Sequence, residues 1–436
     1  MDAAIERRES WLNRVFGRRP GIFFVCLFAW TLTNLDQSLF GYAIPGILAE
    51  FQLPLEAAGT ILTISFVFAA LLIVCAGVAA DRWGRGPVLT VLLASSAVFV
   101  GLQGFAATVV MLTLFRALGF GLSGGLSPIT NALVVENAAD RYRGVAMGLL
   151  QCGYPLGWLL ASLLAAPLLA RYDWRVACFV GFIVVPLAIP IGFYLARSRD
   201  GDATRVRLDA AARSSIDPHG AAGRDPGTAP DTGAGRIRRL FDAEYRGRSL
   251  ASMLLFFAFG GAYAGSAFFF PTFFAQERGY TPADASLLVG LSNGIAVIGY
   301  VGAALLGEFV WPRRSVFVIW VVGGALALLG LLWASSGRSA DLLWFAVMAT
   351  MFYGSQAVVP VLIAELYPTQ VRASALAICA SAPLSIGFAV FPMVVPQVVA
   401  RAGWQLGLSY VVVPLLVIAA VAALCLPNRR SGLPVD

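Results

Sequence analysis

Residues 77–90 read GVAADRWGRGPVLT and place one aspartate and two arginines between two long apolar runs. The run before this stretch covers about residues 56–80, and the run after it covers about residues 86–107. Each run is close to the ~20 residues that an α-helix needs to cross the hydrocarbon core of a bilayer. The stretch therefore predicts two transmembrane helices joined by a short charged loop at the membrane surface.

The whole chain repeats this pattern. Of its 436 residues, 59% are hydrophobic and 13% are charged, and the mean hydropathy is +0.79, which excludes an ordinary soluble globular protein. None of the apolar runs shows the polar face at 3.6-residue spacing that a helix of a soluble protein presents. We therefore predict an all-α integral membrane protein with twelve transmembrane helices, at 21–46, 56–80, 86–107, 109–138, 143–170, 174–197, 248–275, 285–310, 314–335, 340–367, 372–399 and 403–426.

Arginine predicts the orientation, because all 31 basic residues are arginines. With a cytoplasmic N-terminus, 25 of them fall in the tails and cytoplasmic loops, five fall in outer loops and one falls inside a span. By the positive-inside rule both termini are cytoplasmic. The basic charge is spread over many loops, so we do not expect nucleic-acid binding. We expect a bacterial inner membrane protein that acts as a monomer in the lipid bilayer.

A polar segment at residues 198–247 divides the spans six and six. Its Asp, Arg, Gly and Ala composition predicts a flexible cytoplasmic linker. The predicted organisation is an N-terminal six-helix bundle at 1–197, the linker at 198–247, and a C-terminal six-helix bundle with a short tail at 248–436.

The two halves carry related charged stretches. ENAADRYRG begins at Glu136 and ELYPTQVRA begins at Glu365, and each glutamate is followed seven residues later by an arginine, Arg143 or Arg372. The offset between the stretches is 229 residues. Such a duplicated unit is typical of transporters in which two repeats rock about a central site.

Asp81 of the opening stretch has a weaker counterpart in GEFVWPRR. Glu308 lies 227 residues after Asp81 and is followed by Arg313 and Arg314. The near-identical offset supports the six-helix pseudo-repeat.

The twelve spans, the central loop and GVAADRWGRG resemble the major facilitator superfamily over the whole chain. The loop motif of that family is Gly, three residues, Asp, Arg, any residue, Gly, Arg, and Arg or Lys, and the last position is Gly86 here. The resemblance implies a latch in which Asp81 caps a helix end and pairs with an arginine across the bundle in the outward-facing state. A carboxylate at a helix N-terminus is favourable. The residues assigned to this conformational latch are Gly77, Asp81, Arg82, Gly84, Arg85, Glu136, Arg143, Glu308, Arg313, Arg314, Glu365 and Arg372.

Simple alternatives exist for these charges. The positive-inside rule alone accounts for Arg82 and Arg85, although not for Asp81 or the glycines. Glu136 with Arg143 and Glu365 with Arg372 resemble the cytoplasmic charge relay of the same family, and a helix-end ion pair without a transport role is the alternative.

Asp36 and Arg116 are the ionisable residues deep inside predicted spans. At 1.5 Å per residue, Asp36 lies ~22 Å from the inner surface and Arg116 lies ~12 Å from the outer surface of a ~30 Å core. Because charges there are costly, they mark function by default. We predict that the two residues face each other and that protonation of Asp36 releases Arg116, which couples a proton to transport. A static buried pair is the alternative.

The first, fourth and fifth spans resemble aromatic-acid and metabolite:proton symporters, with two departures. Those symporters carry Asp-Gly-any-Asp in the first span, whereas residues 33–36 read TNLD here. Their fourth span often reads Gly-Gly-Glu, and Leu126 takes the place of the glutamate. Polar and aromatic residues of the spans complete the predicted substrate site, which suits a small flat organic anion with Arg116 as its charge partner. These residues are Asn34, Gln37, Asn131, Gln151, Tyr154, Trp158, Tyr263, Asn293, Tyr353 and Gln356.

We therefore predict a secondary active transporter that takes up a small organic anion, such as an aromatic or other carboxylic acid, by proton-coupled symport. A proton-coupled drug or metabolite exporter is the alternative, although GYPLGW at 153–158 lacks the Gly-Pro pair of the antiporter pattern. A transporter-like nutrient sensor is a further alternative. An enzyme is not predicted, because the sequence shows no nucleophile–base pair, metal cluster or phosphate loop. We expect no cofactor and no metal, with the proton as the coupling ion.

Overall fold

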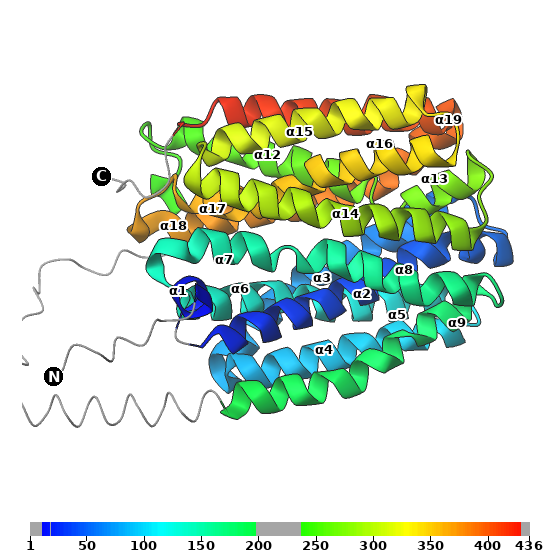
Figure 1. Cartoon of the computed structure of the whole chain (residues 1–436), viewed down its shortest axis with the longest axis horizontal. Coiled ribbons are helices and arrows are strands. Elements are labelled where there is room, and N and C mark those ends of the chain that lie inside the picture. The colour runs from blue at the N-terminus through cyan, green and yellow to red at the C-terminus, as the bar shows by residue number, and fades with distance from the viewer. Residues whose placement is uncertain (1–10, 18, 198–236, 429–436) are drawn as a thin grey trace, which may run out of the picture.

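The computed structural model of the chain describes residues 11–17, 19–197 and 237–428. These residues form helices joined by short turns, and no strand occurs in the described ranges. The helices run along the long axis of the molecule in two side-by-side halves, α1–α9 and α12–α19 (Figure 1). The fold is all-α, as predicted.

The short helix α1 (Trp11–Phe16) precedes the first half. The spans of this half are α2 (Pro20–Glu50), α3 (Leu55–Trp83), α4 (Arg85–Leu102), α5 with α6 (Val109–Gly124 and Leu126–Asn137), α7 with α8 (Arg143–Leu150 and Gly153–Leu169), and the segment Trp174–Arg197, which begins with α9 (Trp174–Phe179).

The second half begins within the predicted linker, of which residues 198–236 lie outside the described residues. Its first three spans are α12 with α13 (Arg246–Ala264 and Phe270–Gln276), α14 (Pro282–Phe309), and α15 (Arg313–Leu329) extended by the π-helical turn η3 (Gly330–Ala334). The fourth span consists of α16, η4 and α17 (Arg338–Met351, Tyr353–Ala357 and Val359–Ala364). The fifth span consists of α18, η5 (Thr369–Ala375 and Leu376–Ser381) and the first part of α19 (Ala382–Leu424), and the rest of α19 is the sixth.

Ten segments of the described chain are long and apolar enough to cross a membrane. One of them, Gln370–Leu424, contains two of the twelve predicted spans, and the predicted span at 248–275 is not among the ten. Helix α19 has 43 residues, and at 1.5 Å per residue its ~65 Å is about twice the thickness of the hydrocarbon core. It bends at Gly403, whose φ of 82° reverses the chain, so α19 contributes to two crossings. Helices α12 and α13 form one more crossing, interrupted by a turn at residues 265–269. The described chain thus makes the twelve predicted crossings.

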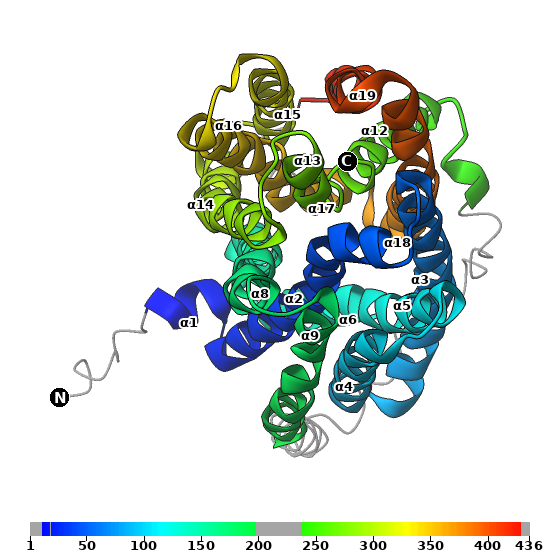
Figure 2. The same cartoon turned by 90° about the vertical axis from the view of Figure 1, so that its right-hand side faces the viewer.

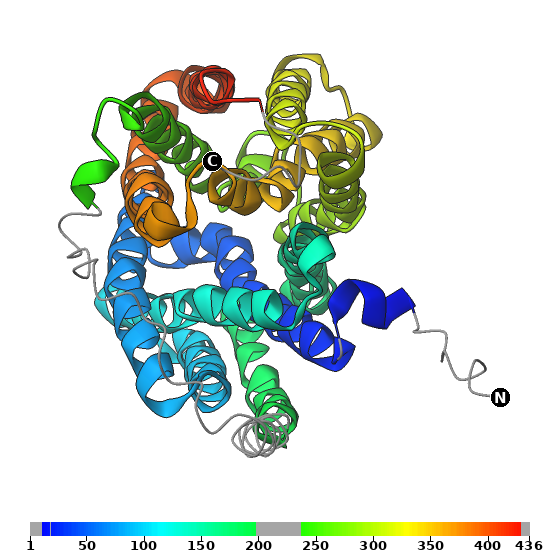
Figure 3. The same cartoon turned by 90° about the vertical axis from the view of Figure 1, so that its left-hand side faces the viewer.

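The molecule has two distinct ends. One end holds α1, the start of α12 and the last residue of α19, and we call it the α1 end; Figure 3 views it face-on. The opposite end holds Glu50 at the end of α2 and the start of α9, and we call it the Glu50 end; Figure 2 views this end.

The halves are in direct contact near the Glu50 end. The hydroxyl of Thr63 on α3 donates to the carbonyl of Ala389 on α19 at 2.8 Å. The hydroxyl of Ser162 on α8 donates to the carbonyl of Ser286 on α14, also at 2.8 Å. Both bonds join a side chain of one half to the backbone of the other. The structure is therefore a conformation in which the Glu50 end is closed.

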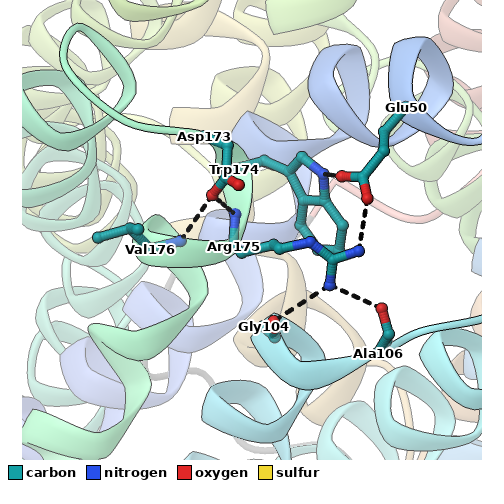
Figure 4. A network of polar contacts seen from close by, with 7 residues as sticks. All are labelled: Glu50, Gly104, Ala106, Asp173, Trp174, Arg175 and Val176. Carbon is teal, nitrogen blue, oxygen red and sulfur yellow. Dashed lines mark hydrogen bonds and ion pairs between the residues drawn. The ribbon is translucent and has the colours of Figure 1, made fainter.

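A polar network also holds the Glu50 end of the first half together (Figure 4). The Glu50 carboxylate accepts from the indole N–H of Trp174 at 2.6 Å and from Nη2 of Arg175 at 2.5 Å. Nη1 of Arg175 donates to the carbonyls of Gly104 and Ala106 at 3.2 and 2.7 Å. These contacts join the end of α2 and the segment between α4 and α5 to the start of α9, and none of them is visible in the hydropathy pattern.

Candidate functional site

Six aromatic side chains form a closed circuit of ring contacts between the two halves. The first half contributes Phe66, Tyr154 and Trp158, and the second half contributes Tyr263, Phe268 and Phe388. The ring centroids are separated by 5.8 Å for Phe268–Trp158, 6.2 Å for Trp158–Tyr154, 5.4 Å for Tyr154–Tyr263, 5.8 Å for Tyr263–Phe388, 5.1 Å for Phe388–Phe66 and 5.9 Å for Phe66–Phe268. We call this circuit the aromatic belt.

Interrupted helices position the belt. The fifth span breaks at residues 151–152, and Tyr154 and Trp158 lie on the first turns of α8 that follow. The seventh span breaks at residues 265–269, which places Phe268 in the turn itself. Backbone that is not helical is tolerated at membrane depth only where protein buries it or where it lines a cavity. Interrupted helices near the membrane midplane are also a common setting for binding sites in membrane proteins.

Arg116 on α5 lies at one edge of the belt. It is fully buried, and its guanidinium carbon lies 4.4 Å from the ring of Phe40, 4.7 Å from Phe120 and 5.8 Å from Phe268. Its Nη1 is 3.5 Å from the carbonyl of Gln37, at the limit of a hydrogen bond. Its Nε and Nη2 are buried without a hydrogen-bond partner among the described residues. Aromatic faces thus hold a cation whose donors are largely unused.

Asp36 lies in the same buried layer, one residue before Gln37 on α2. Neither of its carboxylate oxygens has a hydrogen-bond partner in the described chain. The predicted facing of Asp36 and Arg116 stays a prediction: Arg116 approaches the carbonyl of Gln37, the residue next to Asp36, and no hydrogen bond joins the two side chains in the described chain. A charge on Asp36 would therefore be desolvated without a direct partner in this conformation.

Three tyrosines meet on the other side of the belt. Tyr263 of α12 contacts Tyr154 and Tyr353, each with ring centroids 5.4 Å apart, and Tyr154 contacts Tyr353 at 6.4 Å. Tyr353 lies in η4, the break of the tenth span. The buried hydroxyls of Tyr154 and Tyr263 have no hydrogen-bond partner within the described ranges, and the same holds for the indole nitrogen of Trp158. The hydroxyl of Tyr353 lies beside the side chain of Ser266. We call these three residues the tyrosine cluster.

Other residues of the predicted substrate site use part of their hydrogen-bonding capacity within the protein. The Nδ2 of Asn34 donates to the Trp30 carbonyl at 2.7 Å, and Nε2 of Gln37 donates to the Ser123 hydroxyl at 3.1 Å. The Nδ2 of Asn293 donates to the Val289 carbonyl at 2.9 Å, whereas its Oδ1 is buried without a partner in the described part of the chain.

The remaining residues of the predicted substrate site lie at or near the interrupted helices. Gln151 is buried at the break of the fifth span. Gln356 is partly buried in η4, and Asn131 is partly buried on α6.

The phenylalanines of the site could not be predicted from the sequence. Phe40, Phe66, Phe120 and Phe388 lie in apolar runs of a chain with 30 phenylalanines, and no spacing distinguishes them. Phe268 belongs to the cluster SAFFFPTFFAQ, but its position in the cluster does not show that it contacts both Arg116 and Trp158.

The charged residues at the α1 end form pairs that differ from the sequence spacing. Glu136 pairs with Arg85, and Arg313 pairs with both Glu308 and Glu365. These pairs join glutamates to arginines that the repeated spacing in the sequence does not relate to them. Arg372 instead donates from Nε to the carbonyl of Tyr367 at 3.2 Å.

Asp81 and Gly84 show two further details of the predicted latch. Asp81 lies exposed in the last turn of α3, and no side chain caps α4 in this conformation. The reason is that α3 continues to Trp83 and α4 begins directly after Gly84, whose φ of 90° links the helices. No ion pair joins Asp81 to a described arginine of the second half, and its pairing in the outward-facing state stays a prediction.

The described residues contain no group of three His, Cys, Asp or Glu side chains that could hold a metal ion. The site is therefore best described by its aromatic rings, one buried arginine, one buried aspartate and several unpartnered hydrogen-bonding groups.

Comparisons with known proteins add the following findings. A family model described as Major Facilitator Superfamily matches residues 26–378. The niacin transporter NiaP of Acinetobacter baylyi is 25% identical over 405 residues, which is 90% of each chain. The cis,cis-muconate transport protein of the same organism is 23% identical and covers 89% of each chain. The 4-hydroxybenzoate transporter PcaK of Pseudomonas putida is 25% identical over 81% of this chain and 80% of its own.

Two solved structures share the fold. A bacterial homologue of the human lysosomal transporter Spinster, in an inward-facing and unoccupied conformation, has a TM-score of 0.67 at 17% identity and covers 93% of this chain and 96% of its own. The proton:xylose symporter XylE has a TM-score of 0.67 at 17% identity and covers 92% of this chain and 94% of its own.

Proposed function

The chain belongs to the major facilitator superfamily and is a membrane transporter rather than an enzyme, and we propose that it takes up a small organic acid by proton-coupled symport. The proposed substrate is a small, flat carboxylate. No cofactor is involved, and the coupling ion is the proton. The chain acts as a monomer in a bacterial inner membrane with both termini in the cytoplasm, which makes the α1 end cytoplasmic.

The negative charge proposed for the substrate rests on the surroundings of the Arg116 guanidinium. Its guanidinium is fully buried between aromatic rings, and two of its three nitrogens have no partner among the described residues. A planar guanidinium matches a carboxylate with two parallel hydrogen bonds. A substrate carboxylate at Arg116 would satisfy donors that the protein itself leaves unused. The rings of Phe268 and Trp158 would then pack against the flat body of the substrate.

The names of the relatives agree with this class of substrate. Niacin, cis,cis-muconate and 4-hydroxybenzoate, which name the three relatives described above, are small unsaturated or aromatic carboxylic acids. Transport of small organic acids by this chain is therefore supported from two directions, the residues and the relatives.

Asp36 supports the proton coupling. A carboxylate charge without a partner is costly at this depth, so a proton on Asp36 removes that cost while the site is closed. When the site opens to water, the same group can release its proton at little cost. Asp36 and Arg116 would thereby alternate between a neutral acid with a free arginine, which can hold the substrate, and a charged pair.

Contacts between the halves support alternating access. The Glu50 end is closed through Thr63 and Ser162, whereas Asp81 at the α1 end of α3 is exposed. The proposed orientation makes this conformation one that is closed to the outside. In the opposite conformation these contacts would break, and Asp81 would form its predicted pair across the bundle.

Uptake into proteoliposomes tests the proposal. With an imposed inward proton gradient, we expect radiolabelled 4-hydroxybenzoate or niacin to accumulate, and we expect accumulation to stop when a protonophore removes the gradient. Asp36→Asn should abolish gradient-driven accumulation but retain substrate exchange, because exchange needs no net proton transfer. Arg116→Ala should abolish both. Full accumulation by Asp36→Asn would refute the proton coupling, and thermal stabilisation of the purified protein by lipophilic cations alone would refute the anionic substrate.

A further inference from the structure

The tyrosine cluster lies away from Arg116, on the far side of the apolar rings. Phe268 contacts both the Arg116 guanidinium and Trp158, each at 5.8 Å. Trp158 in turn contacts Tyr154 at 6.2 Å, and Tyr154 contacts Tyr263 and Tyr353. The order from one pole to the other is therefore cation, apolar rings, phenol hydroxyls.

The hydroxyl groups of the tyrosine cluster are buried with unused hydrogen-bonding capacity in the described part of the chain. Each phenol can donate one hydrogen bond and accept others, and buried hydroxyls are normally paired. Tyr154 and Tyr263 are adjacent and have unpartnered hydroxyls, which is an exception that asks for a function, because two other buried tyrosines of the chain are paired. Tyr42 donates to the Trp158 carbonyl at 2.9 Å, and Tyr367 lies 3.0 Å from the Ser249 hydroxyl.

We propose that the tyrosine cluster is a second polar subsite, which binds an oxygen substituent at the end of the substrate remote from its carboxylate. This inference rests on the proposed function, because it assigns the first pole to the carboxylate on Arg116. The substrate class is a flat carboxylate with a hydroxyl, carbonyl or second carboxylate group at its far end. An unsubstituted aromatic acid would leave the phenols unpartnered and bind less tightly.

The position of the cluster also gives it a mechanical consequence. Tyr154 belongs to the first half, whereas Tyr263 and Tyr353 belong to the second half. A substituent that hydrogen-bonds to both sides holds the halves together around the bound substrate. Substrates with the second oxygen group therefore favour the closed conformation more than substrates without it, because a ligand shifts a conformational equilibrium by its difference in affinity for the two states.

Calorimetric binding of benzoate and 4-hydroxybenzoate to the purified full-length protein tests the inference. Wild-type protein should bind 4-hydroxybenzoate about tenfold more tightly, because one net hydrogen bond changes affinity by about that factor. Tyr263→Phe, which removes the hydroxyl of the central tyrosine and keeps its ring, should weaken binding of 4-hydroxybenzoate and reduce the preference to less than about twofold. Tyr154→Phe and Tyr353→Phe repeat the test from each half. Tyr367→Phe is the matched control and should keep the preference.

The outcomes separate the inference from the function on which it rests. Equal affinity of wild-type protein for the two acids, or an unchanged preference in all three cluster variants, would overturn the tyrosine subsite while leaving organic-acid binding intact. Loss of the preference in Tyr367→Phe as well as in the cluster variants would also overturn it, because the effect would then not belong to the cluster. Binding of neither acid by wild-type protein would overturn the proposed function itself.

Discussion

Gly59 offers a way to shift the transporter out of the observed conformation. It lies on α3 near the Glu50 end, where it faces Pro392 of α19. A Cβ added to Gly59 would lie 2.2 Å from the carbonyl oxygen of Pro392, which falls about 1.2 Å short of the 3.4 Å at which ordinary contact begins. Because the obstructing atom belongs to the backbone, no side-chain rotation relieves the clash. Gly59→Ala should therefore force α3 and α19 apart at the Glu50 end.

The size of the effect follows from the cost of overpacking. Inserting one methyl group into a well-packed contact costs about 1–3 kcal/mol. Only the conformation closed at the Glu50 end contains this contact, so the equilibrium between the two conformations should shift toward the open one by about 5- to 150-fold. Gly302→Ala is a matched control on α14, because its added Cβ would meet only the Trp320 ring, at 3.8 Å.

Distance measurements between spin labels check this prediction. Labels on cysteines at positions 56 and 401, in a protein whose six native cysteines are replaced, report the separation of the halves at the Glu50 end. We expect Gly59→Ala to raise the population with the longer distance, and Gly302→Ala to match the parent protein. Identical distance distributions for all three proteins would refute the reasoning and would mean that α19 yields without opening the Glu50 end.

Three further predictions concern stability and are measured by thermal unfolding of the purified protein. Gly84→Ala should destabilise the protein by about 1–3 kcal/mol, because the φ of 90° strains any residue with a Cβ, and an unfolding midpoint equal to that of Gly302→Ala would contradict this reason. Arg313→Gln should cost about 3 kcal/mol, since it leaves Glu308 and Glu365 without the cation that joins them, and a loss below about 1 kcal/mol would mean that water already screens the pair. Burial, together with the hydrogen bond from its hydroxyl to Asp341 at 2.6 Å, raises the pKa of Tyr280 to about 12 from an ordinary value of 10.0. The raised pKa adds stability that is complete below pH 10 and is lost as the pH rises toward 12, so wild-type protein should lose more stability over this range than Tyr280→Phe, and parallel pH profiles would count against the assignment.

Much of the architecture could be predicted from local properties of the chain. Hydropathy over ~20 residues reports whether a segment can cross a bilayer, and this property needs no knowledge of neighbours. The same is true of Asp36 and Arg116, which stand out because an ionisable group inside an apolar run is costly wherever it packs. Even α19, in which two crossings are continuous, was divided correctly because a polar stretch surrounds Gly403.

The candidate site could be predicted only in part. Tyr154, Trp158, Tyr263 and Tyr353 were expected from their polar groups, and the structure brings their rings together. The phenylalanines could not be expected, because a phenylalanine in a membrane helix has the same hydropathy whether it faces lipid, a neighbouring helix or a substrate. The pairing of Glu136 with Arg85, 51 positions earlier in the chain, was likewise hidden, since it depends on which helices are neighbours.

The sequence by itself determined that this protein crosses a membrane twelve times, that its halves repeat, and that a buried acid and a buried arginine lie at similar depth. Each of these properties is local or periodic along the chain. Only the tertiary structure decided that Phe66, Phe268 and Phe388 close a belt with two tyrosines and a tryptophan, and that three tyrosine rings meet across the interface. The physical reason is that these contacts join residues from different spans of both halves, and helix packing, rather than hydropathy, sets which faces of the spans meet.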